Sequence, residues 1–442
     1  MARAKKETAL TPEERLQAAL VPDWEWPYKL PENWCWTTIK NVATVVTGGT
    51  PAKNNSDYYG GEFPFFKPAD LDAGRHVSEA SEYLSDLGKS VSRIIPAQAT
   101  AVCCIGSIGK CGFLDVEGAT NQQINSAIPY FNALYQYFYM NTEFFTNQLR
   151  NSASATTIAI VNKTKMESCY YPLAPLAEQQ RIVDRIESLF AKLDEAKEKA
   201  QAVVDSFETR KAAILHKAFT GELTAKWRRT HGLSLDTWKE VAADSLFEYV
   251  TSGSRGWAKY YDESGAVFIR MGNLDHGTIE LDFSDIQHVK LPNKAEGQRS
   301  RIRKNDILIS ITADVGMVGL VRNDDFEGYI NQHIALARPV MSESAEFIAW
   351  YLVSDIGLKQ MQEKQRGATK VGLSLNDIRA LQLKIPLIEE QNEILKVIKM
   401  WIGKEQQTKE AAEAVLDQID LMKKSILARA FRGELGMNDP NE

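Results

Sequence analysis

The sequence of 442 residues predicts a mixed α+β fold with an internal duplication. Two globular modules are separated by two long helices, which we expect to pair as an antiparallel coiled coil. Three observations support this prediction: motifs that return in the same order, strand-rich segments that alternate with helices, and two long stretches of coiled-coil spacing. The strongest repeats join Pro175–Gln180 to Pro386–Gln391 and Ala218–Leu223 to Ala430–Leu435. The long stretch between the two motifs therefore has nearly the same length in both copies.

Weaker repeats connect the earlier parts of the two copies. They are Trp36 with Trp238, 65–74 with 268–277, 109–112 with 316–319, and 121–129 with 331–339. The separation between partners increases steadily along the chain, which indicates small insertions in loops of the second copy. A period of about 200 residues indicates a duplicated module and excludes a solenoid of short repeats.

The first element, residues 1–31, is expected to be a short helix and an extended connector. Thr11 suits the N-cap, Pro12 the first helical position, and Glu14 completes a capping box. Prolines then end the helix, at positions 22, 27 and 31.

The globular modules are predicted at 32–175 and, after a linker, within 223–385. Short apolar runs bounded by Gly, Pro, Asn and Asp are typical of strands. These runs are 38–39, 42–46, 99–105, 123–128 and 306–311. One amphipathic helix is expected in each module, at Tyr135–Leu149 and at Ala345–Gln360.

The long helices are predicted at 176–222 and 386–435, where apolar residues recur at alternating spacings of three and four. The expected seam of the first helix is Leu176, Val183, Ile186, Phe190, Leu193, Ala200, Val204, Phe207, Ile214 and Ala218. The expected seam of the second is Ile394, Ile398, Trp401, Ala412, Val415, Ile419, Met422 and Ile426. Gly221 and Gly433 stand where a left-handed residue commonly ends a helix. We expect the seams to pack on each other, with the modules at opposite ends.

Composition limits the classes of function. A net charge of −6 argues against a protein that coats nucleic acid without specificity. It still permits local Lys and Arg, or a partner that shares the phosphate contacts. No apolar run is long enough to cross a bilayer, and Met1–Glu7 lacks an apolar segment behind it, so we expect a cytoplasmic location.

Neither catalysis nor metal binding is predicted. The five cysteines lack C-x-x-C spacing and are expected to fill the core as thiols. Nucleotide-binding fingerprints and the [N/D]-P-P-[F/Y/W] element of amino-methyltransferases are absent. Gly106–Gly112 is better explained as a tight strand connection, and Glu195–Lys197 as part of a solvated helix face. We therefore predict no catalytic residue, cofactor site or metal site in this chain.

Polar and basic loops occupy equivalent places in the two copies, at 47–59 with 251–261 and at 152–163 with 366–374. Small residues allow close approach to phosphate, and Arg, Lys and Asn can hydrogen-bond base edges. A solvated turn is the alternative for each loop, but their paired occurrence favours binding. The candidate DNA-contacting residues are Thr47, Gly48, Gly49, Thr50, Lys53, Asn54, Tyr58, Lys67, Arg75, Thr156, Thr157, Asn162, Lys163, Ser254, Arg255, Trp257, Lys259, Tyr260, Arg270, Asn273, Arg366, Thr369, Lys370 and Ser374.

With these motifs the chain resembles the specificity subunits of Type I restriction–modification systems. The resemblance covers residues 22–435. It rests on Leu30–Trp34, Gly48–Pro51, the segment from Tyr58 to Phe65, Pro175–Ile182, Ala218–Leu223 and the second copies of these motifs.

The resemblance implies two target recognition domains, each recognising one half of a bipartite, asymmetric sequence in double-stranded DNA. The two helical spacers would set the gap and dock two modification subunits, which bind S-adenosylmethionine and methylate adenine. Restriction subunits, which use ATP and Mg, would join for cleavage and translocation. The chain itself would be non-catalytic and hold no cofactor. Glu389–Asn392 departs from Glu178–Arg181, so unequal partner contacts are expected there.

Two other classes remain open from the residues alone. An enzyme, such as a fused methyltransferase or a nuclease, would bind S-adenosylmethionine or metal as an isolated chain. A coiled-coil scaffold without direct DNA recognition would not enrich a bipartite sequence from random duplexes.

Overall fold

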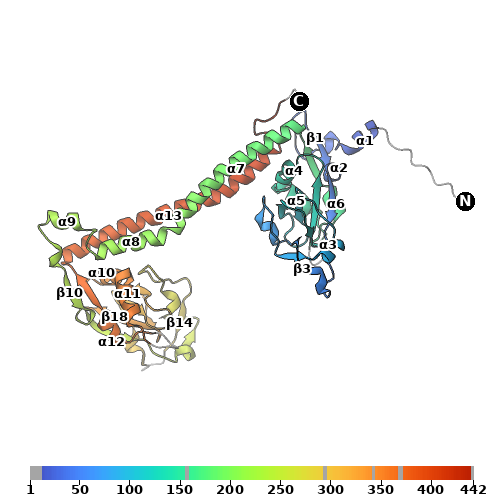
Figure 1. The fold of residues 1–442 in the computed structure, drawn as a ribbon. Helices are drawn as coiled ribbons and strands as arrows, with labels where there is room; N and C mark the ends of the chain where they lie inside the picture. The colour runs from blue at the N-terminus through green and yellow to red at the C-terminus, as the bar shows by residue number, and fades with distance from the viewer. Residues whose placement is uncertain (1–11, 155–158, 292–295, 341–343, 367–371, 440–442) are drawn as a thin grey trace. The chain divides into compact units, whose positions relative to one another are not determined.

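The computed structural model describes residues 12–154, 159–291, 296–340, 344–366 and 372–439. The chain divides into two compact units: unit 1 comprises residues 1–199 and 415–442, and unit 2 comprises residues 200–414. Each unit combines one sheet-rich module with a pair of helices (Figure 1). The long helices α7 (Leu176–Asp205) and α13 (Ile388–Ala430) contribute to both units.

Unit 1 is built on three small sheets. The first pairs β1 with β9 antiparallel, the second has the order β2-β8-β5-β6, and the third has the order β4-β3-β7. The strands are β1 (Cys35–Thr38), β2 (Ala43–Thr47), β3 (Tyr59–Phe66), β4 (Glu82–Leu84), β5 (Thr100–Cys103), β6 (Cys111–Phe113), β7 (Ala119–Thr120), β8 (Ile124–Pro129) and β9 (Tyr170–Leu173). The helices are α1 (Pro12–Ala19), α2 (Ile39–Val42), α3 (Asp86–Ser90), α4 (Ala133–Met140), α5 (Glu143–Ser152) and α6 (Lys163–Glu167).

Unit 2 repeats this plan, with the sheet orders β10-β19, β11-β18-β15-β16 and β12-β14-β13-β17. Its strands are β10 (Lys239–Ala242), β11 (Phe247–Ser252), β12 (Tyr261–Asp262), β13 (Ala266–Ile269), β14 (Gln287–Val289), β15 (Ile307–Ser310), β16 (Val318–Leu320), β17 (Gly328–Ile330), β18 (Ile334–Pro339) and β19 (Gln382–Ile385). Its shorter helices are α8 (Phe207–Phe219), α9 (Ala225–Thr230), α10 (Ala345–Val353), α11 (Asp355–Lys364) and α12 (Leu375–Arg379). The predicted α+β class and duplication are confirmed.

The prediction of a single amphipathic helix in each module is wrong in detail. Both helices are interrupted at equivalent places, so that α4 is followed by α5 and α10 by α11. Thr142 and Ser354 adopt extended backbone at these breaks, and their hydroxyl groups accept hydrogen bonds from Phe145 N and Gly357 N. Each side chain therefore starts a new helix as its N-cap.

Helices pair antiparallel within each unit. In unit 1, Lys423 Nζ lies 2.5 Å from Asp194 Oδ1, and Arg181, nearer the start of α7, donates to Met437 O at 3.2 Å. In unit 2, Arg210 Nε lies 2.5 Å from Glu405 Oε2. There Lys409 lies over the Phe207 ring at 5.0 Å. The antiparallel prediction is confirmed within each unit.

The predicted seam of α13 is partly wrong. Trp401, Val415 and Met422 are 41%, 41% and 48% exposed. Charged side chains such as Glu405 and Lys423 instead point to the partner helix, where they form ion pairs with Arg210 and Asp194. An apolar pattern alone does not reveal such positions.

Two further features distinguish the first long helix. It is interrupted at Ser206, whose Oγ donates to Ala202 O at 2.5 Å, a bond that competes with the helical ladder and bends helices. The first expected seam residue, Leu176, is 61% exposed. The predicted helix ends are confirmed, because Gly221 and Gly433 have φ values of 82° and 74°.

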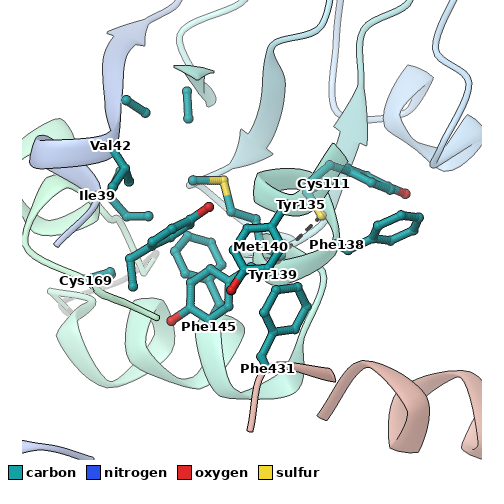
Figure 2. Packing of buried hydrophobic residues seen from close by; sticks show 14 of the residues in the cluster. Ile39, Val42, Cys111, Tyr135, Phe138, Tyr139, Met140, Phe145, Cys169 and Phe431 are labelled. Atoms are coloured by element: carbon teal, nitrogen blue, oxygen red, sulfur yellow. Dashed lines mark hydrogen bonds between the residues drawn. The ribbon is translucent and has the colours of Figure 1, made fainter. Parts of the chain in front are cut away.

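Equivalent aromatic clusters anchor the helix ends to the modules. In unit 1 the Phe431 ring lies between Tyr135 and Tyr139, with centroid distances of 5.0 and 5.3 Å (Figure 2). In unit 2, Phe219 meets Phe347 at 5.3 Å and Tyr351 at 5.2 Å. Four cysteines are buried, and Cys35 is half-buried, which confirms the expectation of core thiols.

The structure also corrects the register of the duplication. Gln179 donates to Ala174 O, and Gln391 donates to Pro386 O, so these two glutamines are equivalent, one position later than the motif alignment implied. Cys35 pairs with Leu173 just as Lys239 pairs with Ile385. Trp238 is therefore equivalent to Trp34 and not, as predicted, to Trp36.

This register makes the fully buried Glu178 and Glu390 equivalent, but their partners differ. Glu390 accepts hydrogen bonds from Thr224 Oγ1 at 2.7 Å, Arg228 Nη1 at 2.5 Å and Trp238 Nε1 at 2.9 Å. Among the described residues, Glu178 is bonded only by the side-chain amides of Asn33 and Asn438. One buried carboxylate thus has a cation beside it and the other has amides.

No helix in the described part of the chain is both long and apolar enough to cross a bilayer.

Candidate nucleic-acid interface

One end of the central sheet gathers the polar loops of unit 1. β2 ends at Thr47 opposite Asn125, and β5 ends at Cys103 opposite Ile124. Segments 48–58, 104–110 and 121–123 therefore leave the sheet at the same end, and Ile160 joins them through its bridge to Ile105. We call this set the loop edge of unit 1.

Unit 2 has an equivalent loop edge. Ser254 bridges to Asn331, while Gly372 bridges to Thr312 and Arg366. The loops that follow β11 and β15, and the one that precedes β18, thus meet at one end of the sheet. The segments that carry Arg255 and Arg366, far apart in sequence, belong to this edge.

A glycine makes the close packing at each edge possible. A Cβ on Gly48 would lie 2.1 Å from Asn121 O, and one on Gly253 would lie 2.1 Å from Asn331 O. Only glycine permits such an approach of two backbones. Gly48 is thus a packing residue, whereas a Cβ on Gly49 would have nothing within 4 Å.

The loop edge of unit 1 presents hydroxyl, amide and ammonium groups. Thr50 Oγ1 donates to Gln122 Oε1, and Thr47 Oγ1 donates to Asn125 Oδ1 at 2.8 Å. Asn162 caps α6 by accepting from Lys165 N at 2.9 Å. The exposed predicted residues here are Lys53, Asn54, Asn162 and Lys163. Tyr58 is half-buried.

The loop edge of unit 2 presents different groups on the same frame. Thr312 Oγ1 lies 2.5 Å from His333 Nδ1, and Gln332 Nε2 lies 2.8 Å from His333 Nε2. The exposed predicted residues here are Arg255, Lys259, Arg366 and Ser374. Tyr260 is half-buried under the Lys259 ammonium.

Ser374 and Asp377 form a capping box at the start of α12. Hydrogen bonds from Ser374 lower the pKa of Asp377, which keeps the carboxylate charged beside Arg366, 3.3 Å away. Arg366 is nevertheless 83% exposed in its side chain. Its guanidinium therefore remains accessible to a ligand.

Several predicted residues serve the fold instead. Trp257 is 5% exposed and stacks on Phe268 at 5.3 Å, and Ser254 is 3% exposed. Asn273 is 4% exposed, with its amide bonded to Arg270 N, Asp282 O and Asp285 O. Their burial contradicts the prediction that these side chains contact DNA directly.

Three predicted cations are held by acids. Arg75 lies over the Phe113 ring and pairs with Asp115 at 3.6 Å and Glu187 at 3.4 Å, among the residues that face α7. It lines a pocket together with segment 106–110 of the loop edge and with residues of α7 and α13. Lys67 and Arg270 pair with Glu82 at 3.0 Å and Asp285 at 3.1 Å. Thr156, Thr157, Thr369 and Lys370 lie outside the described residues.

Sequence reasoning missed Gln122, Gln123, Thr312, Gln332 and His333, which the structure places at the loop edges. The signal was available, since Asn121–Ile124 and Asn331–Ile334 repeat each other. A short polar motif directly before a buried strand marks a loop at the end of the sheet. Within the residues described, no group of three or more His, Cys, Asp or Glu could hold a metal.

Comparison with known proteins agrees with this architecture. The family model described as "Type I restriction modification DNA specificity domain" matches residues 31–204 and 236–414. The EcoBI specificity subunit of Escherichia coli is 26% identical over 317 residues, 68% of this chain and 65% of that protein. The StySPI specificity subunit of Salmonella potsdam is 22% identical over 92% of this chain and 90% of its own length.

Solved structures show the same fold. The HsdS subunit from Thermoanaerobacter tengcongensis matches with a TM-score of 0.60 at 19% identity, covering 93% of this chain and all of that one. A chain from a study of assembly and conformational transition in a type I R-M system matches with a TM-score of 0.69, also at 19% identity, over 92% of this chain and 100% of its own. Because the family model matches both sheet-rich modules, the chain belongs to the family of Type I restriction–modification DNA specificity proteins.

Proposed function

We propose that this chain is the DNA-recognition subunit of a Type I restriction–modification complex. Each loop edge recognises one half of a bipartite, asymmetric DNA sequence. The observation that supports this proposal is that the two loop edges have equivalent backbone structures and present different side chains. At equivalent positions unit 1 offers Thr50 and Gln123, whereas unit 2 offers Arg255 and His333.

The chemistry of the edges suits base recognition. Glutamine and asparagine amides can bond adenine in bidentate fashion, and arginine can bond guanine. Exposed lysines and small residues suit phosphate contacts, which position the protein without reading sequence. A difference in side chains between the edges therefore predicts two different half-sites.

The chain acts, in this proposal, without catalysis and in the cytoplasm, where the DNA and its partners are. Two modification subunits bind S-adenosylmethionine and methylate adenine, and restriction subunits use ATP and Mg. The paired helices set the gap between half-sites and dock the modification subunits. Exposed apolar side chains on the helices support docking, because such side chains gathered on a surface are typical of protein interfaces. They are Met400 and Trp401 in unit 2 and Leu421 and Met422 in unit 1.

The test is the set of methylated sequences made by the complex in cells. Replacing Gln122 and Gln123 with Ala should change or relax one half of the recognised sequence and leave the other intact. Replacing Gln332 and His333 should affect the opposite half. Lys226→Ala, at an exposed site on α9, is the control and should leave both halves unchanged. If either pair alters both halves together, or neither, the proposed division between the units is wrong.

A further inference from the structure

The segment before β15 carries an unusual concentration of positive charge. Arg299, Arg301, Arg303 and Lys304 are all exposed, whereas the intervening Ser300 and Ile302 are 0% and 4% exposed. Arg299 and Ser300 end the short 3-10 helix η8 (Glu296–Ser300), and Arg301 follows directly in a bridge to Tyr329. We refer to Arg299, Arg301 and Arg303 as the arginine row.

A β-bridge and hydrogen bonds fix the backbone of the arginine row. Arg301 forms an antiparallel bridge with Tyr329, and Ile302 N donates to Gly328 O at 3.0 Å. Arg303 N donates to Asp306 Oδ2 at 2.7 Å. The row is thus attached, at Arg301, to strand β17 of the β12-β14-β13-β17 sheet.

The charge of the row is not neutralised by the fold. Within the described part of the chain, no acidic group lies within ion-pair distance of the three guanidinium groups or of Lys304. Asp306, the buried acid at the end of the segment, is bound by Arg338, with two contacts of 2.7 Å. Because Arg338 already compensates this carboxylate, the charge on Arg303 remains available to a ligand.

The row adjoins the loop edge of unit 2. β17 ends at Ile330, directly before Asn331 of that edge, and Arg301 bridges to Tyr329 in the middle of β17. Asn331 stands two residues after Tyr329, which is a separation of about 6.6 Å along an extended strand. Gly297, two residues before the row, packs against the Trp257 ring, which follows Arg255.

Unit 1 has no such row at the equivalent place. Gln98 and Asn305 share an unusual left-handed backbone, with φ of 67° and 71°, which aligns the two segments. The segment of unit 1 has one arginine, Arg93, which donates to Thr47 O at 2.6 Å. It exposes apolar side chains instead, with Val91 54% and Ile94 38% exposed.

We propose that the arginine row is a phosphate-binding surface that binds the DNA backbone beside the half-site recognised by unit 2. The inference rests on the proposed DNA-recognition function and adds that the electrostatic contacts are unequal between the units. Unit 2 supplies a row of free guanidinium groups, and unit 1 supplies apolar contacts at the corresponding place. A net negative protein can bind DNA in this way because the positive charge is concentrated locally.

The experiment compares duplex binding by the full chain across a range of salt concentrations. The variant replaces Arg299, Arg301 and Arg303 together with Gln. The matched control makes the same charge change at three other exposed cations, Lys226 and Arg229 on α9 and Lys239 at the start of β10. The probe is a mixed-sequence duplex, since phosphate contacts do not depend on the bases.

Each phosphate contact contributes about 0.9 to the slope of log affinity against log salt. The row variant should therefore bind more weakly and reduce that slope by about 2.7, while the control keeps the wild-type slope. The row variant should keep the wild-type circular dichroism spectrum, and its complex should methylate the same two half-sites. If the wild-type chain binds the duplex but the row variant and the control have the same affinity and the same salt slope, the inference is wrong while the proposed function stands.

Other outcomes separate the two proposals. If the wild-type chain and its complex do not bind duplex DNA at all, the proposed function fails and the inference fails with it. If the row variant binds DNA normally but no longer assembles with the modification subunits, the row contacts an acidic protein surface and the DNA inference is refuted.

Discussion

The equivalent carboxylates Glu178 and Glu390 allow one substitution to be made twice in the same chain. Both are fully buried, but Glu390 faces the Arg228 guanidinium, whose side chain is only 8% exposed. Glu390→Gln removes the countercharge and leaves a buried cation. Among the described residues, only the side-chain amides of Asn33 and Asn438 bond to the charge that Glu178→Gln removes.

The expected magnitudes differ accordingly. Breaking a buried ion pair by removing one partner costs about 3–5 kcal/mol, because the other charge stays buried without compensation. Glu178→Gln keeps a carbonyl oxygen that can accept from Asn438 and strands no cation, so its cost should be about 1 kcal/mol or less. The double variant Arg228→Gln with Glu390→Gln should recover part of the loss, since no isolated charge remains.

Urea unfolding monitored by two signals can measure these effects unit by unit. All five cysteines lie in unit 1, so thiol labelling follows the unfolding of that unit. Loss of circular dichroism follows both units. Glu390→Gln should lower the urea midpoint for the unfolding of unit 2, a transition that circular dichroism detects and that exposes no thiols to the label. Equal destabilisation by the two substitutions, or a shift confined to thiol release for Glu390→Gln, would refute the assigned roles.

Three further outcomes are expected. Gly48→Ala should destabilise the loop edge of unit 1 and weaken DNA binding, as measured by thermal unfolding and duplex titration, whereas Gly49→Ala should leave the thermal unfolding unchanged. Burial raises the pKa of Cys104 and Cys111 to about 12. Because the thiols of the unfolded chain ionise from about pH 9, unit 1 should lose stability as the pH rises from about 9 toward 12. Thiol labelling at a series of pH values measures this loss. Inserting four residues, about one helical turn, in both long helices where the chain passes between units should change the gap and not the half-sites in methylome sequencing.

Local signals predicted helix ends better than helix interiors. Gly221 and Gly433 were identifiable because a glycine after a long helix commonly adopts the left-handed conformation. The breaks at Thr142 and Ser354 were missed, since both residues lie within continuous amphipathic patterns. Only the hydroxyl-to-backbone bonds seen in the structure show that a second helix begins there.

The seam of α13 shows a second limit of pattern reasoning. Trp401, Val415 and Met422 have suitable spacing, yet a helix can carry apolar residues on more than one face. Which face turns inward depends on the partner helix, and here the ion pairs of Glu405 and Lys423 occupy the interface. Nothing in the sequence of one helix specifies those partners.

The candidate site was predicted at the level of loops and less well at the level of side chains. Loop pairs at equivalent positions do form equivalent edges. Trp257 and Asn273 had suitable chemistry but are buried, and burial depends on contacts with Phe268 and with the 282–285 turn. Gln332 and His333 stand in a short polar motif directly before β18, and its place at the end of the sheet, not its composition, makes it part of the loop edge.

The division between frame and surface explains how one chain can recognise two different half-sites. The contacts that repeat between units are buried, as in the packing of Phe219 and Phe431 against their aromatic partners. The residues that differ, such as Gln123 and its counterpart His333, lie at loop edges and contribute little to these cores. Substitutions at an edge therefore change what a unit binds without the cost of repacking its interior. Duplication followed by divergence at the edges alone is sufficient to produce an asymmetric recognition protein.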